Sequence, residues 1–305
     1  MLIYSIVVTC NGTKWLDKCF GSLLDSAIPT KILAIDNKST DGTPDILRSK
    51  YPSVDVIETG QNLGFGKANN IGLARALSEN AEYVFLLNQD AWVEANTIEK
   101  LVSAQNSTYA IVSPVHLNGR GDGLDFAFAG YLLNSLTLDF LSDICLNRLK
   151  PIYEVPYVNA AAWLLNTKYV DLVGGFDPGF FMYGEDDNYL MRVKYYGLKI
   201  GICPSAKIYH DRQICDYEKW TGLYTKKKEI LVYLKDLNES LIKRIMRFCI
   251  SQCIATLKDT LHLRFRNIMM DVFAIFHVIV VFGHIIKSRE QAKRRCAFIK
   301  KLPCS

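Results

Sequence analysis

The stretch IYSIVVTCNG, residues 3–12, joins seven strand-forming residues to an abrupt polar stop. A continuous apolar run of this length predicts a β-strand that is covered on both faces, because a half-exposed strand would alternate apolar and polar residues. The run is too short for a signal peptide and lacks a basic leader, so we interpret it as part of the folded domain.

Strands and helices alternate after this first strand. We predict further strands at residues 31–35, 54–58 and 83–87, and helices at residues 14–24, 43–50 and within 62–77. Later in the chain we predict strands at residues 110–115, 157–165, 199–203 and 206–209, and a helix at residues 185–196. Short connections between alternating strands and helices predict a doubly wound, mostly parallel α/β sheet.

Each of the first four predicted strands ends in polar residues. These ends are Thr9–Gly12, Asp36, Gly60–Gly66 and Asn88–Asp90. Ligands of such sheets bind beyond the carboxyl ends of the strands. The shared position of the polar residues therefore predicts a binding crevice at this edge of the sheet.

The loop from Asn62 to Gly72 contains a G-x-G pattern, which raises the possibility of a dinucleotide site. That fingerprint needs a third glycine where Asn69 stands, and it follows the first strand instead of the third. The dinucleotide interpretation is therefore excluded. The loop opens a helix, so its backbone N–H groups can hold phosphate or ribose, although a plain strand–helix turn has the same composition.

Three acidic positions have a structural and a functional interpretation. Asp36 can accept hydrogen bonds from a base or ribose. Asp90 is either a turn residue or a ligand to a divalent cation shared with a diphosphate, and His210, after another strand, can join it. Glu185–Asp187 suits a helix N-terminus, but the aromatic run before it would raise a carboxyl pKa and favour a general base.

These motifs together resemble glycosyltransferase family 2, the inverting GT-A enzymes, and within it the rhamnosyltransferase-like members of bacterial surface-polysaccharide pathways. The resemblance runs from about Ser5 to Tyr233. Its most specific segments are SIVVTCNG, AIDNKSTDGT, QNLGFGKANNIGL, LLNQDAWV and VGGFDPGFFMYGEDDNYLMRVKYYGLKIGICPSAKIYH. It implies a GT-A fold and transfer of a sugar from a nucleotide-diphosphate donor by a metal-assisted single displacement.

The resemblance also implies roles for individual residues. The nucleotide would be held by Thr9, Asn11, Asp36, Asn62 and Asn88. The diphosphate would lie near Gly64, Lys67 and Asn69. Trp163 lies in the segment that would line the sugar site. Mg²⁺ or Mn²⁺ would be bound by Asp90 and His210. Asp186 would be the catalytic base, next to Glu185.

Two positions depart from the family pattern. Asn88 replaces the first acid of the Asp-x-Asp motif, and an amide is a poorer metal ligand than a carboxylate. Asn188 replaces the last acid of the Glu-Asp-x-Asp motif. This second change leaves Asp187 as an alternative base, although the register favours Asp186.

Charge divides the chain of 305 residues, whose formal net charge is +5. Residues 1–218 hold 18 Lys and Arg against 25 Asp and Glu, and residues 219–305 hold 18 against 6, so the two parts carry −7 and +12. We predict a catalytic domain over residues 1–218, with a nucleotide-sugar half (1–112) and an acceptor half (113–218), and a basic helical extension over 219–305.

Nine cysteines without a C-x-x-C pair predict free thiols in a reducing cytoplasm.

The extension contains the apolar stretch Ile268–Ile286. Asp271 leaves only the 15 residues Val272–Ile286 after it, fewer than the ~20 that a membrane span needs. We therefore favour a helix that either lies at an anionic membrane surface, on the inner face of the cell membrane, or packs on the body, over a span or a solvated basic face.

The sequence thus favours a hexosyltransferase that acts on a lipid-linked or growing polysaccharide. A sugar nucleotidyltransferase would need a basic Gly-rich loop after the first strand, where only Asn11–Lys14 stands. A non-catalytic lipid- or nucleic-acid-binding protein would leave the acidic crevice unexplained.

Overall fold

The computed structural model describes residues 1–132, 138–212, 222–262 and 264–300. The predicted boundary between residues 218 and 219 lies outside the described residues. No disulfide joins the seven cysteines that the structure describes.

Within these ranges, nine strands form one sheet with the order β3-β2-β1-β4-β8-β6-β9-β5, and β7 pairs with β9. The strands are β1 (Ile3–Thr9), β2 (Lys31–Asp36), β3 (Asp55–Glu58), β4 (Tyr83–Asn88), β5 (Ala91–Val93), β6 (Tyr109–Asn118), β7 (Tyr153–Glu154), β8 (Ala162–Asn166) and β9 (Lys199–His210). The first four are parallel, as predicted. β8 runs antiparallel to both β4 and β6, whereas β9 is parallel to β6. The carboxyl end of β9 therefore lies at the same edge of the sheet as those of β1 and β4.

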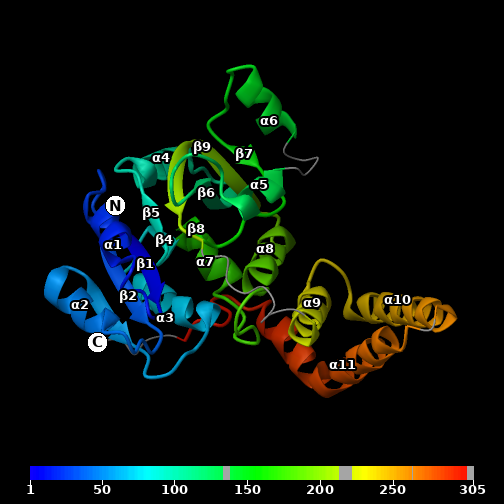
Figure 1. Ribbon diagram of the computed structural model, residues 1–305. Helices are drawn as coiled ribbons and strands as arrows, with labels where there is room; N and C mark the ends of the chain where they lie inside the picture. The colour runs from blue at the N-terminus through cyan, green and yellow to red at the C-terminus, as the bar shows by residue number, and fades with distance from the viewer. Residues whose placement is uncertain (133–137, 213–221, 263, 301–305) are drawn as a thin grey trace.

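Helices cover both faces of the sheet (Figure 1). The helices are α1 (Leu16–Leu24), α2 (Thr43–Lys50), α3 (Phe65–Ser78), α4 (Thr97–Ala104), α5 (Phe126–Leu132), α6 (Leu138–Cys145), α7 (Thr167–Val173), α8 (Glu185–Tyr195), α9 (Leu223–Lys235), α10 (Leu241–Leu261) and α11 (Phe265–Gln291). Alternate residues of β1 explain the layers, because side chains of a strand point to opposite faces. Tyr4 and Ile6 pack with α3, α7 and α8, and Ile3 and Val7 pack with α1, α2 and α4.

Four of the predicted elements differ from the structure in ways that have a clear physical reason or a clear shift of their start. The strand predicted at residues 157–165 begins only at Ala162. The strands predicted at 199–203 and 206–209 are one strand, β9, because a register shift opposite Pro114 accommodates the interrupting residues. The helix predicted from Lys14 begins at Leu16.

In the part of the basic extension that the structure describes, three helices project from the α/β body (Figure 1). The helices α9, α10 and α11 share a small core that includes Leu234, Phe248 and Val278. A buried ion pair connects them to the body, with Lys235 Nζ 2.8 Å from Asp177 Oδ2. After α11 the chain returns to the body, where the backbone N–H of Gly175 donates to the carbonyl of Ala297 (2.7 Å).

Candidate active site

The ends of β1 and β2 form a hydrogen-bonded base for the predicted nucleotide site. The carboxylate of buried Asp36 accepts from Thr9 Oγ1 (3.0 Å), the Ser39 backbone N–H (2.9 Å) and Ser39 Oγ (2.5 Å). These bonds use Asp36 to shape the loop after β2. The sequence did not indicate Ser39 as its partner.

Two exposed asparagines flank this base. Asn11 has a φ of 51°, and its side-chain oxygen accepts from the backbone N–H of Thr40 (2.8 Å). The side-chain oxygen of Asn62 accepts from the Gly64 N–H and from Asn37 Nδ2, both at 2.9 Å. Both side chains thus hold loops together at the rim of the crevice.

The loop before α3 approaches a second loop, residues 177–184, very closely. Gly64 has a φ of +77°, and a Cβ there would lie 2.0 Å from the carbonyl oxygen of Phe181. The backbone N–H of Phe65 donates to that same oxygen (3.2 Å). Only glycine permits this approach. It brings the predicted diphosphate loop against the segment that leads into the acidic helix α8.

The first turns of α3 place the other two predicted residues differently. Lys67 is exposed, near the helix N-terminus, where its ammonium can meet a phosphate. Asn69 is buried, and its side-chain N–H donates to the Phe65 carbonyl (3.1 Å) within the same helix.

The turn after β4 is held by a residue that the sequence did not single out as a site residue. The Gln89 side chain accepts from the backbone N–H of Cys10 (2.9 Å) and donates to its carbonyl (3.1 Å). This pair of bonds fixes the turn against the end of β1. It sets the positions of Asn88, which is partly buried, and of Asp90.

Asp90 and His210 meet at this turn. Asp90 Oδ1 lies 3.3 Å from Nε2 of His210, which is buried at the end of β9. The other imidazole nitrogen, Nδ1, has no hydrogen-bond partner among the described residues, and its nearest carboxylate oxygen is Asp125 Oδ2 at 3.6 Å. Asp125 also pairs with Arg212 (3.1 Å) and accepts from the Phe128 N–H at the start of α5 (2.9 Å).

This pair fits a divalent cation. Two ligands that each lie about 2.1 Å from a cation at a right angle are about 3 Å apart, close to the observed separation. Among the described residues no group of three His, Cys, Asp or Glu side chains converges as a metal site. Asp90 and His210 are therefore a two-residue set of the kind that leaves the other cation ligands to phosphate oxygens and water.

The start of α8 concentrates three carboxyl groups. Burial and the charge of Asp186 raise the pKa of Glu185 to about 8 and the pKa of Asp187 to about 6. Asp186 itself is partly exposed, and its Oδ2 accepts from the hydroxyl of Tyr157 (2.9 Å). This bond orients the carboxylate that the sequence register favours as the base.

Tyr131 connects the two acidic groups. Its ring lies edge-on to Tyr157, with centroids 4.7 Å apart. Burial and the charge of Asp186 raise its pKa to about 12, while Arg212 opposes this rise and Asp125 adds to it. Tyr131 therefore lies within the electrostatic reach of both the α8 start and the His210–Asp125 group. The sequence did not predict Asp125, Tyr131 or Tyr157, because no local pattern marks them.

Trp163 lies deeper than the resemblance implied. Its side chain is fully buried and stacks on Phe176, with centroids 6.1 Å apart, beside Tyr189. The indole thus supports the segment behind the crevice through packing.

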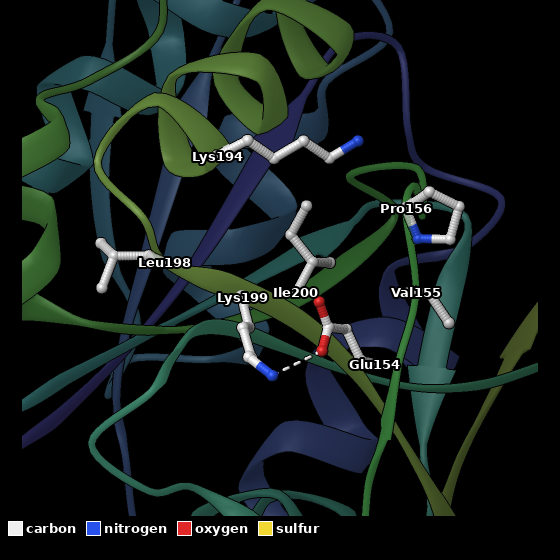
Figure 2. A pocket seen from close by; sticks show the side chains of 7 residues that line it. All are labelled: Glu154, Val155, Pro156, Lys194, Leu198, Lys199 and Ile200. Carbon is white, nitrogen blue, oxygen red and sulfur yellow. Dashed lines mark hydrogen bonds and ion pairs between the residues drawn. The ribbon is translucent and has the colours of Figure 1, made fainter. Parts of the chain in front are cut away.

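A surface pocket lies at the opposite end of β9. It is lined by Glu154, Val155, Pro156, Lys194, Leu198, Lys199 and Ile200. Figure 2 shows its ion pair, in which Lys199 lies 2.6 Å from Glu154. Since Lys199 begins β9 and His210 ends it, this pocket is separate from the carboxyl-edge site.

Comparison with known proteins finds similar sequences and similar folds. Residues 5–141 match the model of Glycosyl transferase family 2. The N-acetylglucosaminyl-diphospho-decaprenol L-rhamnosyltransferase of Mycobacterium tuberculosis is 27% identical over 235 residues, which cover 68% of this chain and 75% of that protein.

Solved structures share the fold. The mannosyltransferase PcManGT of Pyrobaculum calidifontis, in complex with GDP-Man and Mn²⁺, has a TM-score of 0.59 and 16% identity over 91% of this chain and 86% of that chain. GalNAc-T7 with UDP, GalNAc and Mn²⁺ has a TM-score of 0.58 and 17% identity, and the match covers 76% of this chain but only 47% of that chain. The match over residues 5–141 confirms the resemblance to glycosyltransferase family 2 that the motifs indicated; the chain adopts the expected GT-A fold and is a glycosyltransferase.

Proposed function

We propose that this enzyme transfers rhamnose or another hexose from a nucleotide-diphosphate donor to a hydroxyl group of a lipid-linked or growing polysaccharide, with inversion at the anomeric carbon. The name of the mycobacterial relative specifies rhamnose transfer and a diphospho-decaprenol acceptor. The structure of PcManGT is a complex with GDP-Man and Mn²⁺. The mycobacterial name supports our proposal of a surface-polysaccharide role, such as synthesis of a capsule or an O-antigen, and the PcManGT complex supports a nucleotide-diphosphate sugar as donor with a divalent cation.

The contact between the Gly64 loop and the segment before α8 is the observation that carries the proposal. It places the carboxylates of α8 beside the loop proposed to hold the donor diphosphate. Asp186, oriented by Tyr157, is then the base that removes the proton of the acceptor hydroxyl as its oxygen attacks the anomeric carbon. Attack from the face opposite the leaving diphosphate inverts the configuration.

Donor binding is assigned to the remaining residues at the sheet edge. We propose that Thr9, Asn11, Asp36, Asn62 and Asn88 surround the nucleoside, and that the backbone at Gly64, the exposed Lys67 and the helix turn with Asn69 face the diphosphate. Asp90 and His210 would hold Mg²⁺ or Mn²⁺. The bound cation supplies charge stabilisation to the departing diphosphate.

Asp125 positions His210 in this scheme. Metal-bound histidines commonly direct their second N–H to a carboxylate, which fixes the ring and leaves the other nitrogen as the ligand. Asp125 Oδ2 stands on the Nδ1 side and Asp90 stands on the Nε2 side. The geometry thus supports Nε2 as the metal-binding atom.

Lipid-linked acceptors would lie at a membrane, and we propose that the basic extension brings the enzyme to its cytoplasmic face. The segment Asn267–Gln291 of α11 is long and apolar enough, by length and composition, to cross a membrane, and most of its apolar part is not buried within the protein.

The decisive experiment is Asp186→Asn with Asp187→Asn as its matched neighbour, assayed across a panel of nucleotide-diphosphate sugars with and without Mn²⁺. Loss of the base should lower kcat for transfer by about a thousandfold, while the affinity for the nucleotide diphosphate stays within about twofold because Asp186 does not hold the donor. Asp187→Asn should retain most activity. Wild-type turnover in Asp186→Asn would reject the assignment, and the reverse pattern would make Asp187 the base.

A further inference from the structure

The helix α10 carries an apolar stripe that the other described residues of the chain leave exposed. Its residues recur every three or four positions, which places them on one helix face. The stripe consists of Ile242, Met246, Ile250, Ile254, Leu257 and Leu261, whose side chains are between 56% and 75% exposed. The sequence pattern indicates an apolar, membrane-facing segment only in α11.

The helix α11 has a matching exposed face. It consists of Phe265, Met269, Val272, Phe276, Ile279 and Val280, between 57% and 70% exposed. The opposite face of α11 is already used, since Ala274, Val278 and Ile285 are buried in the core of the extension. Contiguous exposed apolar surface of this kind marks an interaction site.

We propose that these two stripes, the docking face, lie in the plane of an anionic membrane surface and hold the enzyme there as a two-helix anchor. This inference rests on the proposed function and extends it, because it names the surface and the chemistry of its partner. Exposed lysines at positions 243, 258 and 287 on the same helices can meet anionic headgroups while the apolar side chains enter the acyl boundary.

Charge favours lipid over a second copy of the chain. The extension carries +12, so a symmetric pairing through the docking face would bring two strongly positive segments together. An anionic bilayer offers the complementary charge and an apolar layer at the same time.

Polar contacts favour an in-plane helix over a crossing one. Asp271 lies within the apolar part of α11, is buried, and pairs with Lys226 of α9 at 2.8 Å. The hydroxyl of Thr256 in α10 donates to the same carboxylate (3.2 Å). A crossing α11 would carry this ion pair, and the lysine-rich α9, into hydrocarbon, where charged groups are costly.

The test is flotation of the full-length protein with vesicles of phosphatidylcholine alone or with added phosphatidylglycerol. The variants are Ile250→Ser/Ile254→Ser on α10 and Phe276→Ser/Ile279→Ser on α11, with Leu24→Ser/Ile46→Ser on the catalytic body as a matched control of exposed residues. Wild type and control should bind the anionic vesicles, release in high salt or alkaline carbonate, and bind neutral vesicles poorly. Each variant on the docking face should lose about tenfold or more in partition coefficient.

Three outcomes would overturn the proposal. Equal binding by all four proteins would show that the docking face does not meet lipid, and retention after carbonate extraction would show a crossing helix. A soluble dimer that the docking-face variants dissociate, without lipid binding, would assign the face to a second copy. Circular dichroism verifies folding of each variant. Transferase activity on a soluble acceptor is measured separately, so a failure of the proposed function is distinguishable from a failure of docking.

Discussion

Glu185 allows the electrostatics of the candidate active site to be measured without any substrate. Its side chain is buried at the start of α8, Oε2 has no hydrogen-bond partner among the described residues, and burial with the charge of Asp186 raises its pKa to about 8. The folded protein therefore holds this proton at neutral pH, whereas the unfolded chain, with a pKa near the model-peptide value of about 4.3, has lost it. The Glu185→Gln substitution keeps the shape of the side chain and removes its titratable carboxyl group.

The sign and size of the effect follow from proton linkage. Between these two pKa values the folded state binds more protons than the unfolded state, so the free energy of unfolding falls as pH rises. One pKa unit corresponds to about 1.4 kcal/mol, so the wild type should lose on the order of 3 kcal/mol between pH 4.5 and pH 7 from this group. Glu185→Gln lacks this loss and should become progressively more stable than wild type over that window.

Urea denaturation at pH 5, 6, 7 and 8 measures the difference directly. We expect the two proteins to be nearly equal at pH 5 and to separate until about pH 8. Asp187→Asn is an internal control, because its pKa is raised only to about 6 and its gain should stop growing above that pH. Parallel stability curves for wild type and Glu185→Gln would show that Glu185 is ionised in the folded protein and that its pKa is not raised.

Two further predictions concern the metal pair and the interface with the extension. Asp125→Asn should weaken Mn²⁺ affinity by about tenfold or more, because His210 loses its orienting carboxylate. The affinity is measured calorimetrically in the presence of a nucleoside diphosphate. If Asp125→Asn binds Mn²⁺ as tightly as the exposed control Asp122→Asn, Asp125 does not have this role. Asp177→Asn should cost about 3–5 kcal/mol in the free energy of unfolding, because Lys235 would be left buried without its partner. The comparison is Asp139→Asn, which removes an ion pair whose carboxylate is 81% exposed and should change stability little.

The first half of the fold could be predicted closely because its elements are locally encoded. β1 has the predicted bounds Ile3–Thr9, since a buried parallel strand is a continuous apolar run. α2 has the predicted bounds Thr43–Lys50, since a turn residue and an N-terminal proline mark its start. Residues 113–160 gave little signal, because α5 and α6 are short helices whose apolar patterns are brief.

The residues of the candidate site also fall into two groups, those that a local sequence pattern locates and those that it does not. Asp90, Asp186 and His210 stand next to strand ends or a helix start, which are positions that a sequence pattern can locate. Asp125 faces His210 from 85 residues earlier in the chain, and Tyr157 meets Asp186 across 29 residues. Such partners are chosen by tertiary packing, and neither hydrophobic periodicity nor turn chemistry records them.

Contacts at both ends of the extension hold it against the α/β body, despite the opposite net charge of the two parts. Ser288 Oγ donates to Asp177 Oδ2 (2.5 Å), and the backbone N–H of Cys296 donates to the Asp171 carbonyl (2.7 Å). Asn70, in the helix that follows the donor loop, donates to both Phe176 and Phe298. Deletion of residues 240–305 would therefore remove buried partners of the segment that leads to Asp186, in addition to the docking face. A truncated enzyme that fails to bind lipid would not separate loss of the anchor from loss of the fold, whereas substitutions on the exposed stripes of α10 and α11 leave every one of these contacts in place.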